Sequence, residues 1–205
     1  MLRQPARAML IDLDGVVRRW DPAVPAGVEK AYGLAPGVLL DTAMAWELLR
    51  PAVAGEMTDA EWMSLVAGRL PLPAADATAA VADWQRHRGT VDEEALGFVR
   101  EVRAAGLPVG LATNATDRLH EDLALLGLSG EFDAVVSSRD LRIHKPAPDF
   151  YRRACAVLGL EPPWVLFVDD DDRAVRAARA LRMPAYRWTG PQDLGYLRRA
   201  LGLPG

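Results

Sequence analysis

Two patterns of hydrophobic and polar positions divide this chain at about residue 90. Beyond that point, amphipathic helical stretches alternate with apolar runs that are too short for helices and are typical of buried strands. Helices are predicted over residues 93–105, 119–126, 150–158 and 173–181, and strands over residues 108–112, 134–137, 165–168 and 185–187. Regular alternation of this kind predicts an α/β fold in which helices flank a parallel sheet on both faces.

The earlier part of the chain predicts a single strand followed by a helical insert. Residues 21–36 are broken up by proline and glycine, and three or four helical patterns follow up to about residue 88. Thr58 and Glu61 form the sequence signature of a capping box at the start of one helix, and residues 74–84 indicate another. The insert shows no strand signal.

The strand before the insert carries the strongest chemical signal. An apolar run over residues 8–11 ends in Asp12 and Asp14, and Gly15 follows at once. Because side chains alternate along a strand, both carboxylates are expected on one side of its carboxyl end, where ligands bind in open parallel sheets. Two neighbouring carboxylates repel each other unless a cation or a shared proton relieves them. This strand end is therefore interpreted as a chemical site.

Composition limits the classes of function. The 205 residues are half hydrophobic, which allows one domain with a sizeable core, or a core with a small insert. A formal net charge of -4 argues against an extended basic surface that would bind nucleic acid. No apolar segment is long enough to span a membrane. Asp12 cuts the first apolar stretch too short for a signal peptide, so a cytoplasmic protein is expected. The one cysteine, Cys155, is expected to be a small buried residue, and the composition leaves the oligomeric state open.

Further polar residues stand where the other predicted strands end. They are Thr113-Asn114, Ser137-Ser138 and the run Asp169-Asp170-Asp171-Asp172, with Lys145 in the loop after the third strand. The carboxyl ends of parallel strands lie side by side, so these groups are expected to converge. Acids that cluster at two facing strand ends would repel one another, and a hard divalent cation such as Mg²⁺ would relieve the repulsion.

Three of these residues suit the binding of a phosphoryl group. The chain has only two lysines, Lys30 and Lys145, among many arginines, which suggests that a compact ammonium is needed at the strand ends. Thr113, Asn114 and Lys145 together offer a hydroxyl, an amide and an ammonium. Such donors can hold the oxygens of a phosphoryl group during its transfer.

The order of these motifs resembles the haloacid dehalogenase superfamily. The matching residues are Asp12-Leu13-Asp14-Gly15, Thr113-Asn114, Lys145-Pro146 and Asp169-Asp170. The surroundings of the last two motifs are similar to the subgroup that has a helical cap inserted after the first motif. The resemblance covers the whole chain. It implies a Rossmann-like core formed by residues 1–17 and 89–205, and a small α-helical cap formed by residues 18–88.

The resemblance also implies a role for each matching residue. Asp12 would be the nucleophile that forms an aspartyl-phosphate, and Asp14 would be the general acid and then the base. Lys145 would neutralise charge at the nucleophile, while Thr113 and Asn114 would bind the phosphoryl oxygens. The dehalogenases of the superfamily lack the second acid, so the presence of Asp14 points to phosphoryl transfer.

A magnesium site is implied as well. Mg²⁺ would be held by the carboxylates of Asp12 and Asp170 and by the backbone carbonyl of Asp14. Relatives usually carry an asparagine four residues after the second aspartate of the last motif, where this chain has Ala174. We hypothesise that one of the two acids that follow Asp170 compensates for this loss.

These features predict a Mg²⁺-dependent phosphatase that acts on a small phosphorylated metabolite of the sugar phosphate type. Two alternatives stay open: a sugar phosphomutase of the same superfamily, and a non-catalytic protein that binds a metabolite or a partner protein.

Of the tryptophans, Trp20 is expected to face the substrate, because it follows the first motif closely. Trp46, Trp62 and Trp84 fall in helical patterns and are expected in the core of the cap.

Overall fold

A five-stranded parallel sheet forms the centre of the computed structural model, which describes residues 4–204. The strands lie in the order β5 (Ala134–Ser137), β4 (Val109–Thr113), β1 (Ala8–Ile11), β6 (Val165–Asp169) and β7 (Ala185–Arg187). Each neighbouring pair is parallel, so the predicted α/β class is confirmed. The chain builds one side of the sheet and then crosses to the other side of β1. Such a reversal leaves a crevice at the carboxyl ends of the central strands.

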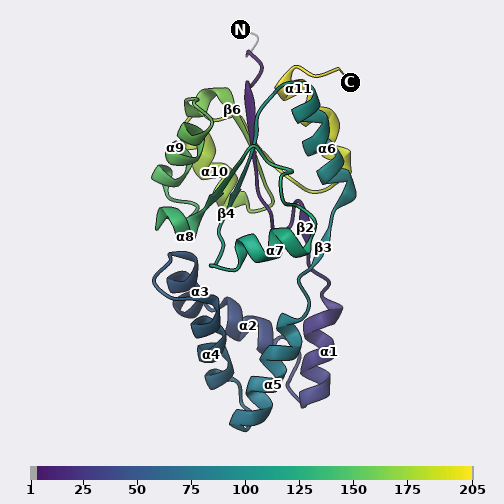
Figure 1. Cartoon of the computed structure of the whole chain (residues 1–205), viewed down its shortest axis with the longest axis vertical. Coiled ribbons are helices and arrows are strands. Elements are labelled where there is room, and N and C mark those ends of the chain that lie inside the picture. The colour runs from purple at the N-terminus through teal and green to yellow at the C-terminus, as the bar shows by residue number, and fades with distance from the viewer. Residues whose placement is uncertain (1–3, 205) are drawn as a thin grey trace.

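Helices cover both faces of this sheet. One face packs against α6 (Glu93–Ala104), α7 (Leu119–Leu125) and α11 (Leu194–Leu201), and the other against α9 (Pro148–Val157) and α10 (Asp172–Ala180) (Figure 1). Met9 and Ile11 of β1 enter the first core, whereas Ala8 and Leu10 enter the second. A strand that is buried on both faces reads as a continuous apolar run, which explains why polar residues appear only where it ends.

Three further short elements complete the sheet domain. They are α8 (Ser138–Leu141) and two 3-10 turns, η1 (Pro162–Trp164) and η2 (Pro191–Asp193).

Cys155, on α9, is fully buried as expected, and burial raises the pKa of its thiol to about 12. This environment makes the thiol a poor nucleophile. None of the described helices is long and apolar enough to cross a membrane.

Five helices between residues 19 and 90 form a separate group, which we call the helical unit. They are α1 (Ala23–Tyr32), α2 (Val38–Met44), α3 (Trp46–Val53), α4 (Asp59–Arg69) and α5 (Ala74–Gln85). Leu39, Trp62 and Val66 belong to a hydrophobic core that these helices share. The unit lies beyond the carboxyl ends of the strands, on the side of the crevice (Figure 1). Thr58 begins α4 with the predicted capping box.

The structure differs from the sequence prediction in two places. A helix, α1, forms within the stretch that proline and glycine break up. Pro25 lies in its first turn, where a missing backbone N–H costs little, and Gly33 ends it in the left-handed conformation. Residues Arg18–Arg19 form β2 in a region expected to lack strands, and pair antiparallel with β3 (Thr90–Val91). These two strands connect the sheet to the helical unit, and each depends on a partner far away in the sequence.

Candidate active site

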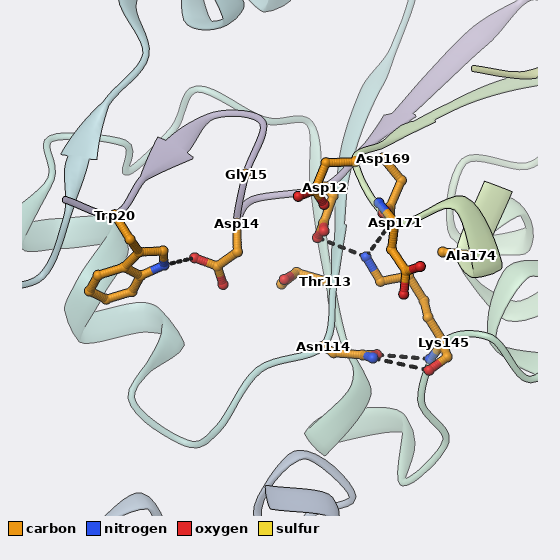
Figure 2. A pocket seen from close by; sticks show the side chains of 11 residues that line it. Asp12, Asp14, Gly15, Trp20, Thr113, Asn114, Lys145, Asp169, Asp171 and Ala174 are labelled. Atoms are coloured by element: carbon orange, nitrogen blue, oxygen red, sulfur yellow. Dashed lines mark hydrogen bonds and ion pairs between the residues drawn. The ribbon is translucent and has the colours of Figure 1, made fainter. Parts of the chain in front are cut away.

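A pocket of about 430 Å³ opens at the carboxyl ends of β1, β4 and β6. The residues that line it are Asp12, Asp14, Gly15, Trp20, Thr113, Asn114, Lys145, Asp169, Asp170, Asp171 and Ala174 (Figure 2). Every residue to which the resemblance gave a role is among them, whereas Ser137, Ser138 and Asp172, which were also expected to converge here, do not line the pocket. The pocket thus unites four separate segments of the chain, as the parallel order of the strands predicts.

A tight turn after β1 brings the backbone against the end of β6. The carbonyl of Leu13 accepts hydrogen bonds from the amides of Val17 and Arg18, at 2.9 and 2.7 Å. Gly15 has a φ of +77°, and a Cβ atom at this position would lie 2.1 Å from a carboxylate oxygen of Asp170. Glycine is therefore required both for the conformation of the turn and for its close approach to the acid.

Asp12 and Asp169 share one buried cation. The Nζ atom of Lys145 lies 2.8 Å from Oδ1 of Asp12 and 2.7 Å from Oδ2 of Asp169. The second oxygen of Asp169 accepts a hydrogen bond from the amide of Asp171 at 2.8 Å. Asn114 holds the backbone of Lys145, since its side-chain amide donates to the lysine carbonyl at 3.0 Å and accepts from the lysine amide at 2.8 Å.

These acids, of which Asp12 and Asp169 are buried and Asp170 is exposed, carry more negative charge than the nearby lysine offsets. One oxygen from each of Asp12, Asp169 and Asp170 lies within 4.8 Å of the others, beside the single ammonium of Lys145. Burial and the nearby Asp169 raise the pKa of Asp12 to about 7, although the lysine acts in the opposite direction. Burial also raises the pKa values of Asp169 and Asp170. The carboxylates outweigh the effect of burial on Lys145 and raise its pKa.

A second cation would relieve this imbalance. Each raised pKa means that the ionised carboxylate is disfavoured where it lies, and a nearby positive charge favours the ionised form. Carboxylate oxygens are the hard ligands that Mg²⁺ prefers, and one or two of them suffice when water and phosphate complete the coordination. The carboxylates of Asp12 and Asp170 therefore fit a magnesium ion, whereas both oxygens of Asp169 are already bonded within the protein.

Asp14 points away from Asp12, toward the chain that leaves the sheet (Figure 2). Its Oδ1 accepts hydrogen bonds from Nε of Arg18 at 2.7 Å and from Nε1 of Trp20 at 2.6 Å, and its Oδ2 accepts one from Nη2 of Arg18 at 2.9 Å. Strand alternation, from which both carboxylates are expected on one side, does not set these directions. β1 ends at Ile11, and the backbone turns before it reaches Asp14. Both carboxylates nevertheless line the same pocket.

The residues expected to bind phosphoryl oxygens lie at the end of β4. Thr113 is its last residue, and Asn114 follows directly. One N–H of the Asn114 amide donates to Lys145, which leaves the second N–H for another acceptor. The contacts of these residues to a substrate stay predictions, as do the other assigned roles.

The acids that follow β6 have different surroundings. Asp169 ends the strand and binds the buried lysine, a contact that the sequence does not predict. Asp171 is the N-cap of α10 and also lines the pocket, whereas Asp172 forms an ion pair with Arg176. The hypothesis that a neighbouring acid compensates for Ala174 therefore stays a prediction, best placed at Asp171.

The tryptophans give a mixed outcome. Trp20 is 45% exposed and lines the pocket, while Trp62 and Trp84 pack in the core of the helical unit, as expected. Trp46 does not enter that core. It is 49% exposed, and its ring meets the ring of His144 edge to face at a centroid distance of 5.1 Å. It stands at the first residue of α3, where the helical pattern does not fix which way a side chain faces.

The family comparison matches most of the chain. The model described as "Hydrolase: haloacid dehalogenase-like hydrolase" matches residues 6–182. The chain belongs to the haloacid dehalogenase-like hydrolase family. The resemblance carried by the four motifs is thereby confirmed.

Relatives of this haloacid dehalogenase-like hydrolase include named phosphatases. It is 31% identical over 135 residues to the fructose-1-phosphate phosphatase YqaB of Escherichia coli (strain K12). That alignment covers 65% of this chain and 60% of the relative. It is 26% identical over 215 residues to the phosphoglycolate phosphatase of the same organism, covering 92% of this chain and 83% of the relative.

Solved structures agree with the fold. A family enzyme from Bacteroides thetaiotaomicron, solved as a variant in complex with magnesium and inorganic phosphate, has a TM-score of 0.72 at 18% identity. The match covers 94% of this chain and 98% of that one. The L-2-haloacid dehalogenase of Xanthobacter autotrophicus has a TM-score of 0.63 at 25% identity, covering 89% of this chain and 77% of that one.

Proposed function

We propose that this protein is a Mg²⁺-dependent phosphatase that hydrolyses a small phosphorylated metabolite through an aspartyl-phosphate. The observation that carries the proposal is a pair of carboxylates, Asp12 and Asp14, in one pocket but in different surroundings. Asp12 is buried beside Lys145, whereas the Asp14 side chain is 38% exposed and bound by Arg18. A nucleophile and a proton-transfer group need such different environments. The relatives named as phosphatases support the same reaction.

The first half of the reaction is assigned to Asp12. One of its carboxylate oxygens attacks phosphorus, and the bond from phosphorus to the leaving oxygen breaks. Lys145 orients the attacking carboxylate and offsets the charge of the phosphoryl group, whose oxygens are assigned to the Thr113 hydroxyl and to the remaining N–H of Asn114. Asp14 gives its proton to the leaving oxygen.

The second half returns the site to its starting state. Asp14, now ionised, takes a proton from a water molecule whose oxygen attacks the phosphorus of the aspartyl-phosphate. The bond between phosphorus and the Asp12 oxygen breaks, and inorganic phosphate leaves. Mg²⁺, held by the carboxylates of Asp12 and Asp170 and the backbone carbonyl of Asp14, would offset the negative charge that the phosphoryl group brings to the nucleophile.

We assign the helical unit to a cap domain of residues 18–88, and residues 1–17 and 89–205 to the core domain. Hydrogen bonds join the two parts. Oγ of Ser138 donates to the carbonyl of Val53 at 2.6 Å, and the amide of Asp59 donates to Asp117 at 2.7 Å. A cap in this place limits entry to small substrates and excludes bulk water during transfer.

The charges of the pocket favour a substrate with a neutral leaving group. Among the described residues that line it, Lys145 is the one cationic side chain, and two carboxylates already bind it. A leaving group that carries its own carboxylate, as in phosphoglycolate or phosphoserine, would meet several acids and no free cation. The exposed ring of Trp20 offers an apolar face against which a sugar ring can pack. We therefore propose sugar phosphates, such as fructose 1-phosphate, rather than phosphorylated acids.

Phosphate release from p-nitrophenyl phosphate tests the reaction and its nucleophile. We expect release by the wild type in the presence of Mg²⁺, and a loss on the order of 10³-fold or more in Asp12→Asn. Asp149→Asn is a matched control, because this carboxylate lies on the surface of α9 and pairs with Arg152. Substantial turnover by Asp12→Asn beside an active control would refute the assignment of the nucleophile.

A panel of phosphate esters separates the remaining possibilities. Free phosphate from fructose 1-phosphate supports the phosphatase, whereas an isomerised sugar phosphate would indicate a phosphomutase. A wild type that releases no phosphate from any ester in the presence of Mg²⁺ would indicate a non-catalytic binding protein. A preference for phosphoglycolate over fructose 1-phosphate would contradict the assignment of a neutral leaving group.

A further inference from the structure

An arginine outside the motifs controls the surroundings of Asp14. Arg18 stands on β2, the first connection from the sheet to the helical unit, and its side chain is only 7% exposed. Its Nε and Nη2 atoms donate to the two oxygens of Asp14, at 2.7 and 2.9 Å. We propose that Arg18 is the positioning residue for Asp14 in proton transfer. This inference rests on the proposed acid–base role of Asp14.

Asp14 needs a partner of this kind because the sheet no longer holds it. It lies in a turn beyond the end of β1, with a partly exposed side chain that could otherwise rotate. Proton transfer requires one carboxyl oxygen within hydrogen-bond reach of the leaving oxygen, in a defined direction. Two parallel bonds from the planar guanidinium of Arg18 fix both the position and the plane of the carboxylate. A third bond comes from the indole of Trp20, whose ring centre lies 4.5 Å from the same guanidinium.

Arg18 is itself held by a buried acid on α7. Its Nη1 atom donates to Oδ2 of Asp122 at 2.9 Å, and the Asp122 side chain is 5% exposed. Arg88, which lies just before β3 in the second connection, donates to both oxygens of Asp122 at 2.8 and 2.6 Å. One carboxylate therefore ties both connections together, and Arg18 extends this link to Asp14. Movement of the helical unit about its connections would move Arg18, and the Asp14 carboxylate with it.

The charges of this cluster balance only when Asp14 is counted. Two guanidinium groups, of Arg18 and Arg88, face the single carboxylate of Asp122, and both side chains are largely buried. An unpaired buried cation is costly, so Asp14 completes the cluster in its ionised form, the form that takes a proton from water in the second half of the reaction. In the protonated form that serves the leaving oxygen, hydrogen bonds alone keep the carboxyl group in position. Mutual dependence of this kind makes the position of Asp14 sensitive to each member.

Two substrates with different needs for a proton test the assignment. p-Nitrophenolate leaves readily without a proton, whereas the alkoxide that leaves from fructose 1-phosphate needs one. If the wild type prefers another sugar phosphate of the panel, that ester replaces fructose 1-phosphate. Because kcat/KM reports the steps up to phosphoryl transfer, the ratio of kcat/KM for the sugar phosphate to that for p-nitrophenyl phosphate measures the contribution of the acid.

We expect Arg18→Lys and Arg18→Gln to lower this ratio by about tenfold or more, in the same direction as Asp14→Asn. The lysine variant keeps the charge but loses the two-bond geometry. Asp122→Asn should lower the ratio by a smaller factor, because Arg18 keeps its bonds to Asp14. Arg19→Lys is the matched control: it changes the neighbouring arginine of β2, which pairs with Asp92 at the start of α6.

Each outcome separates the inference from the proposed function. An equal loss of kcat/KM for both substrates in Arg18→Lys, or an unchanged ratio, would overturn the positioning role and leave a structural one. If Arg18→Gln fails to give the wild-type circular dichroism spectrum, the lysine variant and Asp122→Asn decide the matter. A wild type that releases no phosphate from either substrate would overturn the proposed function, and the positioning role with it.

Discussion

The pocket has two walls that hold a carboxylate by opposite means. The sheet wall consists of Asp12, Lys145 and Asp169, and the turn wall consists of Asp14, Arg18 and Trp20. In the sheet wall, strand ends hold the acids in a buried place, and one lysine serves two of them. In the turn wall, hydrogen bonds from side chains hold the partly exposed Asp14, and the charge of Arg18 balances that of its carboxylate.

The two walls of the pocket suit two different chemical tasks. Asp12 directly follows β1 and Asp169 ends β6, so the sheet fixes the positions of these acids, and their surplus of negative charge suits a metal ion and a phosphoryl group. The turn wall depends on bonds from the first connection to the helical unit, so its geometry can follow that unit. We therefore expect changes in the sheet wall to affect every substrate, and changes in the turn wall to depend on the leaving group.

The largest effect is expected at the lysine of the sheet wall. Lys145→Met removes the donor beside Asp12, and phosphate release should fall on the order of 10²–10³-fold with p-nitrophenyl phosphate and with sugar phosphates alike. Lys30→Met is the control, because it changes the other lysine of the chain, which is exposed on α1. A loss that depends on the leaving group would break the distinction between the two walls.

A smaller effect is expected at the proposed magnesium ligand. Asp170→Asn should raise the Mg²⁺ concentration for half-maximal activity by about 10–100-fold, because the ion loses a charged oxygen. Asp172→Asn, two residues along the chain, should leave it unchanged, since Asp172 pairs with Arg176. Titration of activity with Mg²⁺ measures both variants, and equal half-maximal concentrations would remove Asp170 from the ligand set. The same titration of Asp171→Ala tests whether that acid compensates for Ala174.

The surplus of acids in the sheet wall should also lower stability. Burial raises the pKa of Asp12 from 3.8 to about 7, so without metal the native chain holds a proton that the unfolded chain releases between these pH values. The contribution of this group to the free energy of unfolding is therefore lost as pH rises from about 4 to 7. Asp12→Asn removes the penalty and should be more stable than the wild type at pH 8, by roughly 1–3 kcal/mol, with the difference vanishing near pH 4.

Urea unfolding in the presence of EDTA at both pH values measures this effect. We expect no gain in stability for Asp14→Asn, because this change removes the ionised partner of Arg18 in the turn wall. That contrast would distinguish the two walls. A wild type and an Asp12→Asn variant of equal stability at pH 8 would contradict the idea that burial of the nucleophile costs folding free energy.

The smallest effect is expected at the tryptophan of the turn wall. Trp20→Phe removes the indole donor but keeps both bonds from Arg18 to Asp14, so kcat/KM for sugar phosphates should fall only about two- to fivefold, within the range of one hydrogen bond. The value for p-nitrophenyl phosphate should change less. Trp62→Phe is the control, since its indole donates within the helical unit, to the carbonyl of Ala43. Equal effects on both substrates would assign Trp20 to general packing.

The turn wall and the connections lie beyond what a sequence pattern can report. The pair Arg18–Arg19 looks like an ordinary polar turn, because its partners at Thr90–Val91, Asp92 and Asp122 are distant along the chain. Trp46 fits a helical pattern, yet its ring lies against His144, in the loop before α9. Asp169 stands in a recognised motif, but only its distance from Lys145 reveals that it shares the cation of the nucleophile.

The sequence alone determined the sheet, the order of its helices and the residues at the strand ends. Unbroken apolar runs in the sequence indicate buried strands, and polar residues at the carboxyl ends of such strands converge in any parallel sheet. The tertiary structure decided the directions of the two aspartates that follow the first strand. β1 ends before either of them, and a glycine turn, a buried lysine and an arginine from the connection send Asp12 and Asp14 to opposite walls of one pocket. The local sequence pattern determines at which strand end such a residue lies, whereas contacts with residues distant in sequence determine where its side chain points.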